Sequence, residues 1–190
     1  GELHERTHRA GVDVAGVVHG LFLLEVPPGR HVLAQVVAQA EIQAAHGLKV
    51  PLFVAYAWSS DITKANSPEV VRIGPSNDIL ASAFAPFLHL RGYRHVAIIA
   101  EDTPFGRGLG GTVQATATLA GINMTAHEFS RDAHDLRPTL NKVLPSKPDA
   151  IVVAAHAAPA LYLGVTQVRA AGYKGDIVLA WDYIDDAFWK

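Results

Sequence analysis

Short apolar runs alternate with longer amphipathic stretches along the whole chain. The apolar runs, which we expect to form strands, are Val14–Val18, Leu52–Ala55, Val70–Ile73, Val96–Ala100, Ile122–Ala126, Ala150–Ala154 and Ile177–Ala180. Most of them are rich in valine and isoleucine and show little polar alternation. That pattern is typical of strands buried on both faces of a parallel sheet.

The stretches between these runs place apolar residues at helical spacing. The expected helices are Val32–His46, Ile79–Leu90, Gly108–Ala120, Leu136–Leu144 and Pro159–Ala171. Gly92, Gly121 and Gly172 each follow a helix and precede a strand, where a left-handed residue commonly ends the helix. Asp135 is placed to cap the fourth helix. The repeated strand–helix order predicts an α/β fold with open parallel sheets flanked by helices.

Composition narrows the class of protein. The 190 residues suffice for one sizeable core or two small lobes, and the formal net charge of -2 comes with no Lys/Arg cluster, so no nucleic-acid partner is expected. The absence of cysteine excludes disulfides, Cys-ligated zinc and thiol catalysis. No histidine pair has metal-ligand spacing on a helix face, and no apolar run approaches the roughly 18 residues of a spanning helix.

The segment Gly74–Asp78 is a possible seam between two lobes. It leaves the strand Val70–Ile73 through Gly-Pro-Ser-Asn and enters a helix, which fits either a crossover between lobes or an ordinary strand–helix loop. The chain begins in what looks like a helix end and closes in what looks like a helix start. We therefore expect an excerpt of a longer protein, whose signal peptide, if any, is not in this sequence.

Several landmarks recur in a family order. They are Gly20 after a strand, Val50–Val54, Ala57–Thr63, Val71–Ser76, Val96–Asp102, Phe105–Gly108, Lys147–Val153 and Arg169–Tyr173. No single landmark is specific, but their order and spacing are. In this the chain resembles the type I periplasmic solute-binding proteins of ABC transporters, in particular the branched-chain amino-acid-binding group.

The resemblance implies a two-lobe architecture that closes on a small amino-acid-like ligand without bond chemistry or a cofactor. Residues 1–75 would be the rear part of lobe one, and residues 76–190 most of lobe two. It also implies a membrane permease as partner and a periplasmic or extracellular location. An extracellular sensor domain with the same two lobes is the alternative within the binding class.

Ligands of open parallel sheets bind beyond the carboxyl ends of the strands, which selects the loops His19–Glu25, Tyr56–Thr63, Glu101–Gly108, Ala155–Pro159 and Trp181–Asp185. The candidate ligand-binding residues on these loops are Gly20, Phe22, Tyr56, Ala57, Trp58, Ser59, Phe105, His156, Ala157, Trp181 and Asp182.

The resemblance implies a role for three of these candidates and a departure from the family at a fourth. Ser59 and backbone N–H groups would hold the ligand's carboxylate, Phe105 would cover the ligand, and Asp182 would pair with an α-ammonium. Trp58 stands where the family commonly has a small hydroxyl residue, which leaves aromatic acids possible as ligands. Each residue also has a structural reading: a turn cap for Ser59, core packing for Phe105 and a helix cap for Asp182. His156 fits a ligand contact or a structural hydrogen bond equally.

One motif favours an enzyme instead. Gly106, Gly108 and Gly111 satisfy the dinucleotide-binding spacing, and Glu128 after a later strand could bind a ribose. However, residues 101–105 separate the strand from the first glycine, whereas the fingerprint needs that glycine in the tight turn at the strand end. No nucleophile elbow or phosphate loop is present in the sequence.

Overall fold

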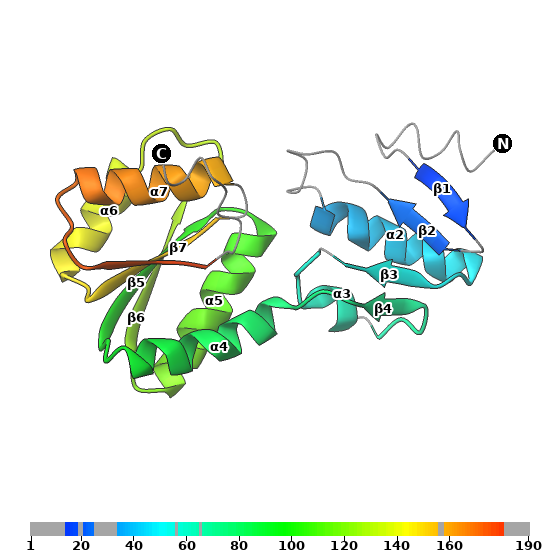
Figure 1. The fold of residues 1–190 in the computed structure, drawn as a ribbon, viewed down its shortest axis with the longest axis horizontal. Coiled ribbons are helices and arrows are strands. Elements are labelled where there is room, and N and C mark those ends of the chain that lie inside the picture. The colour runs from blue at the N-terminus through cyan, green and yellow to red at the C-terminus, as the bar shows by residue number, and fades with distance from the viewer. Residues whose placement is uncertain are drawn as a thin grey trace. The chain divides into compact units, whose positions relative to one another are not determined.

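The computed structural model describes residues 14–18, 21–24, 34–55, 57–64, 66–155 and 158–180, with side chains from residue 38 onward except at Ala158 (Figure 1). The chain divides into two compact units, Gly1–Ser76 and Asn77–Lys190. Each is an α/β unit with parallel strands and flanking helices, which confirms the predicted fold class.

The first unit is built around a parallel strand pair and one long helix. Helix α2 (Ala34–Leu48) precedes β3 (Leu52–Val54), and a short helix α3 (Asp61–Lys64) leads into β4 (Val70–Arg72). Strands β3 and β4 pair in parallel register, with Leu52 opposite Val70. Apolar residues from α2, β3 and α3 form the core: Ala38, Ile42, Ala45, Leu52, Val54, Ala57 and Ile62.

The expected loop His19–Glu25 is partly wrong. Strand β1 (Val14–Val18) is followed by β2 (Leu21–Leu24), which pairs with it antiparallel and sets Phe22 opposite Val17. Phe22 therefore lies on a strand and not in a loop beyond a parallel strand. Four consecutive apolar residues favour a strand, and the sequence prediction passed over this run.

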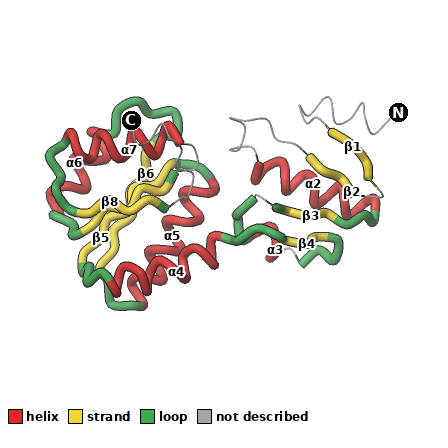
Figure 2. The backbone as a smooth tube through the Cα atoms, viewed as in Figure 1, coloured by secondary structure: helices red, strands yellow, loops and turns green. Residues whose placement is uncertain are grey.

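The second unit is a four-stranded parallel sheet in the order β6-β5-β7-β8. The strands are β5 (His95–Glu101), β6 (Asn123–Phe129), β7 (Ala150–Ala154) and β8 (Asp176–Leu179). Helices α4 (Asn77–Leu90) and α5 (Pro104–Leu119) cover one face. Helix α6 (Arg137–Val143), its 3-10 extension η2 (Leu144–Ser146) and α7 (Ala158–Ala170) cover the other (Figure 2).

The core of this unit lies where the central strands meet the two helical layers. Every residue from Val96 to Ala100 and from Ala150 to Ala155 is buried, as expected of central parallel strands. Leu109 and Val113 of α5 and Leu140 of α6 close over them, each at most 1% exposed.

The three glycines predicted to end helices are confirmed, whereas the predicted cap of α6 is not. Gly92, Gly121 and Gly172 all adopt positive φ, at 76°, 77° and 85°, which only glycine does at little cost. Asp135 accepts the backbone N–H of Arg137 at 2.9 Å and also binds its guanidinium. The cap residue of α6 is nevertheless Leu136, which makes no side-chain cap bond.

Candidate ligand-binding site

In the first unit, the carboxyl end of β3 continues into a tightly packed loop formed by residues 57–60. Ala57 is 5% exposed and belongs to the core, Trp58 and Ser59 are half-buried, and Ser60 is buried. Helix α3 follows directly and is anchored by Ile62, which is fully buried. Three of the predicted ligand-binding residues, Ala57, Trp58 and Ser59, therefore lie together on one rigidly anchored loop.

The guanidinium of Arg72 braces this loop from β4. Its Nη1 donates to the carbonyl oxygen of Ala57 at 2.7 Å, and its Nη2 donates to that of Ser59 at 2.6 Å. Nη1 also reaches the carbonyl oxygen of Pro75 at 3.2 Å. Sequence reasoning missed this residue, whose only signal is an arginine within an otherwise apolar strand.

The two serine hydroxyls of the loop differ in their surroundings. The oxygen of Ser59 accepts the backbone N–H of Asp61 at 3.3 Å, so the turn-cap reading of Ser59 is present in the structure. Its hydroxyl hydrogen can still donate elsewhere. The oxygen of Ser60 is buried and has no hydrogen-bond partner in the described part of the chain. A buried hydroxyl without a partner is uncommon.

In the second unit, the carboxyl end of β5 carries a buried polar cluster. Thr103 Oγ1 donates to the carboxylate of Glu101 at 2.8 Å and accepts the N–H of Gly106 at 3.1 Å. Thr103 is thereby the N-cap of α5, with Pro104 at the first helical position. Glu101 is 1% exposed and Thr103 5% exposed.

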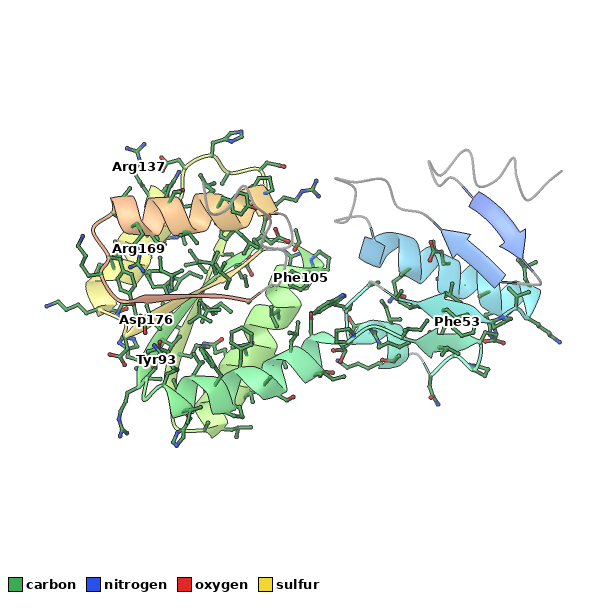
Figure 3. The ribbon with its side chains drawn as sticks, in the orientation of Figure 1. Phe53, Tyr93, Phe105, Arg137, Arg169 and Asp176 are labelled. Carbon is green, nitrogen blue, oxygen red and sulfur yellow. The ribbon has the colours of Figure 1, made fainter. Side chains whose placement is uncertain are left out.

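Phe105 lies in the first turn of α5 and is 2% exposed (Figure 3). Its ring is thus packed within the second unit, as the core reading of this residue requires. A role in covering a ligand remains a prediction for Phe105.

The glycine-rich segment does not have the geometry of a dinucleotide fingerprint. Helix α5 begins at Pro104, so Gly106, Gly108 and Gly111 all lie inside the helix and not in a strand-to-helix turn. A Cβ on Gly106 would come within 2.1 Å of the Glu101 carbonyl oxygen, whereas one on Gly111 would meet nothing within 4 Å. Gly106 is explained by the close approach of helix and strand.

The structure does not describe six of the candidate ligand-binding residues. Gly20, Tyr56, His156, Ala157, Trp181 and Asp182 lie outside the described residues. Within the described ranges, no cluster of three or more His, Asp or Glu side chains is arranged to hold a metal ion. None of the helices there has the length and apolar character needed to cross a bilayer.

The opposite, amino-terminal edge of the second sheet is tied together by charged groups. The carboxylate of Asp149 accepts the backbone N–H groups of Arg94 and His95 at 2.7 and 2.8 Å, and these bonds hold its pKa below the usual value. Asp176 binds Arg91 at 3.1 Å and also accepts the hydroxyl of Tyr93 (Figure 3). This edge stabilises the sheet, whereas the carboxyl ends carry the candidate loops.

Two sequence comparisons bear on the family. The profile of the family described as "Periplasmic binding protein" matches residues 30–190, well over half of the chain. No curated protein sequence matches it.

Solved structures resemble the chain at moderate identity. An extracellular ligand-binding receptor from Rhodopseudomonas palustris HaA2 is 27% identical with a TM-score of 0.67, over 76% of this chain and 40% of that one. A leucine-binding protein from Thermotoga maritima MSB8 is 22% identical with a TM-score of 0.69, over 75% and 41%. An R. palustris ABC-transporter solute-binding protein in complex with 4-hydroxybenzoate is 24% identical with a TM-score of 0.62, over 77% and 39%.

The chain spans only about two-fifths of the length of each of these three structures. They are receptors and binding proteins, and their fold is the type I periplasmic-binding-protein fold that the landmarks predicted. Because the family profile covers the described part of both units from α2 onward, the chain belongs to the periplasmic binding protein family.

Proposed function

We propose that the chain is part of the solute-binding component of an ABC transporter and captures a small, carboxylate-bearing, amino-acid-like solute. A membrane permease would be its partner, and the periplasm or the extracellular space its location. Family membership supports binding over catalysis. Residues 1–75 would then be the rear part of lobe one and residues 76–190 most of lobe two, with hinge closure as the mechanism.

The observation that carries this proposal is the 57–60 loop. Ligand sites combine apolar walls with a few well-placed polar groups. Here a half-buried indole, Trp58, stands beside two serine hydroxyls on a loop whose backbone is braced by Arg72. Backbone N–H groups and a hydroxyl suit a carboxylate, and the indole suits an apolar or aromatic body.

Two ligand classes fit this chemistry. The leucine-binding protein and the 4-hydroxybenzoate complex are both structural relatives, and both named ligands join a carboxylate to an apolar body. They differ in the α-ammonium, which only the amino acid carries. On our proposal that ammonium pairs with Asp182, so Asp182 should matter for an amino acid and not for a benzoate.

A thermal-shift screen of the chain with L-leucine, 4-hydroxybenzoate and NADH tests the proposal, because a ligand that binds the native state raises the unfolding midpoint. We expect a shift with leucine that Asp182→Asn abolishes and that the nearby control Asp186→Asn retains. A shift with 4-hydroxybenzoate that survives in Asp182→Asn would assign an aromatic acid instead. A shift with NADH alone would contradict the proposal.

An extracellular sensor domain is the second candidate, because one of the similar structures is an extracellular ligand-binding receptor. Transport and sensing share the ligand and the closure. Uptake of the solute identified in the screen distinguishes them when it is measured in cells that lack the gene. Deletion of a transport component lowers uptake, whereas deletion of a sensor leaves uptake unchanged.

A further inference from the structure

We infer that Arg72 is the positioning residue of the ligand loop: its guanidinium sets the backbone of residues 57–60 so that two peptide N–H groups face away from β4, toward an anionic ligand. The inference rests on the proposed function for the identity of the loop. In this role Arg72 acts through the backbone carbonyl oxygens that it binds and not through a contact with the ligand.

The geometry follows from the planarity of the peptide. The Arg72 fork holds the carbonyl oxygens of Ala57 and Ser59 at 2.7 and 2.6 Å. In a trans peptide the C=O and the following N–H point in opposite directions. The N–H groups of Trp58 and Ser60 are therefore directed away from the guanidinium, on the side where they can donate to an anionic ligand.

The same fork fixes the place of Trp58. The fork holds the 57–58 peptide, which precedes Trp58, and the 59–60 peptide, which follows Ser59, so Trp58 lies in the short segment between two held peptide units. A planar guanidinium can hold two convergent oxygens in fixed directions, whereas a lysine ammonium acts as a single point charge on a flexible stem. The orientation of the indole, and with it the apolar wall of the proposed site, depends on the fork.

Arg72 also joins the loop to the last residues of the first unit. Its Nη1 reaches the carbonyl oxygen of Pro75 at 3.2 Å. Nearby, Gly74 lies so close to the end of β3 that a Cβ would come within 2.1 Å of the Ala55 carbonyl oxygen. The ends of β3 and β4 thus lie close together, and one guanidinium binds both the 57–60 loop and Pro75.

The second unit offers a matched control. Arg169 Nη1 donates to the carbonyl oxygens of Tyr173 and Gly175 at 3.1 and 2.7 Å, so it is also an arginine that clamps backbone carbonyls. It lies in the last turn of α7. Loss of its clamp should cost stability without changing the 57–60 loop.

The test uses the full chain in a Trp181→Phe/Trp189→Phe background, which leaves Trp58 as the sole indole because the sequence has three tryptophans. Acrylamide quenching of Trp58 and hydrogen exchange of a peptide spanning residues 57–60 are compared in the background, Arg72→Lys and Arg169→Lys. We expect Arg72→Lys to raise the quenching constant and to speed exchange roughly tenfold or more, as the loss of charge-assisted bonds predicts. Arg169→Lys should change neither.

Chemical rescue gives a second, independent readout. In Arg72→Ala, millimolar methylguanidine should restore the quenching of Trp58 toward the background value, whereas methylammonium should not, because only the former offers a planar fork. If Arg72→Ala does not fold, the Arg72→Lys comparison decides alone. Unchanged quenching and exchange in Arg72→Lys, or equal changes in Arg169→Lys, would overturn the inference.

Ligand titrations separate this inference from the proposed function. Calorimetry with L-leucine and 4-hydroxybenzoate on the unaltered chain tests the function, and if neither binds, the loop measurements still decide the role of Arg72 in setting the backbone. If either binds, we expect Arg72→Lys to weaken it roughly tenfold. An unchanged Kd together with a loosened loop would refute a positioning role toward the ligand.

Discussion

Substitution of glycine by alanine should have opposite effects on stability at two positions of helix α5. At Gly106, a Cβ would come within 2.1 Å of the Glu101 carbonyl oxygen and 3.0 Å of its carbon. That is roughly 1 Å short of an ordinary C···O contact, and the obstacle is backbone, which cannot rotate away. At Gly111, a Cβ would meet nothing within 4 Å.

The magnitudes follow from these distances. Gly111→Ala should stabilise the second unit by about 0.5–1 kcal/mol, the usual gain of alanine over glycine inside a helix. Gly106→Ala has the same gain but must push α5 off the end of β5, which costs about 1–3 kcal/mol. The push also strains the bond from the Gly106 N–H to Thr103, a cap worth about 1 kcal/mol. We expect a net loss of about 2 kcal/mol.

Urea unfolding of the two variants and the unaltered chain, followed by far-UV circular dichroism, measures the difference. The unfolding free energy should rise for Gly111→Ala and fall for Gly106→Ala. If Gly106→Ala were as stable as Gly111→Ala, the close contact between α5 and β5 would be wrong. The explanation of Gly106 by packing alone would then fail as well.

Three further predictions follow from buried and charged groups. Burial raises the pKa of Glu41 from 4.5 to about 7. Between these values the folded chain keeps a proton that the unfolded chain loses, so the unfolding free energy should fall by about 1–2 kcal/mol, after screening, as the pH rises from about 4.5 to 7. Urea titrations of Glu41→Gln should lack this fall. Thr103→Ala removes both the cap of α5 and one hydrogen bond to the Glu101 carboxylate, and should lower the unfolding free energy by about 2 kcal/mol. Thr103→Ser is the nearly neutral control in the same assay. The Asp149 carboxylate has a lowered pKa because it accepts two backbone N–H groups. Its contribution to stability should therefore be fully present above pH 3.8 and be lost as the pH falls below that value. In acid titrations, Asp149→Asn should lose less unfolding free energy than the unaltered chain.

Sequence reasoning located the central strands of the second sheet well and one of its two edge strands, β6, poorly. Strand β7 occupies the predicted residues Ala150–Ala154, because a strand buried on both faces reads as an unbroken apolar run. On the edge strand β6 the apolar run ends at Ala126, but the strand continues to Phe129 through the half-buried His127 and the exposed Glu128. An unbroken apolar run identifies a strand buried on both faces, but it does not identify the exposed part of an edge strand.

The start of α5 was predicted four residues too late for a similar reason. The apolar spacing predicted a helix from Gly108, whereas Thr103 caps the helix and Pro104 is its first residue. Threonine followed by proline is a good N-cap and first-position pair, so the signal was present in the sequence. The closeness of α5 to Glu101, which makes Gly106 necessary, depends on tertiary packing and has no local signature.

The candidate site was predicted at the level of loops and not of contacts. The rule that ligands bind beyond the carboxyl ends of parallel strands selected the segment that contains residues 57–60. It did not show that the oxygen of Ser59 caps a turn while the hydroxyl of Ser60 is buried without a partner among the described residues. Two adjacent serines look alike in sequence, and the path of the backbone determines which one is satisfied.

Arg72 was missed because its partners are carbonyl oxygens, which every residue carries and which leave no pattern in a sequence. If peptide N–H groups grip the carboxylate, the constraint on sequence falls on the residues that shape the loop, Arg72 and Gly74, and not on those that face the ligand. Trp58 is then free to set the size and aromatic character of the ligand without loss of the grip. On the proposed function, a single substitution at Trp58 should therefore change the solute while Arg72 stays fixed.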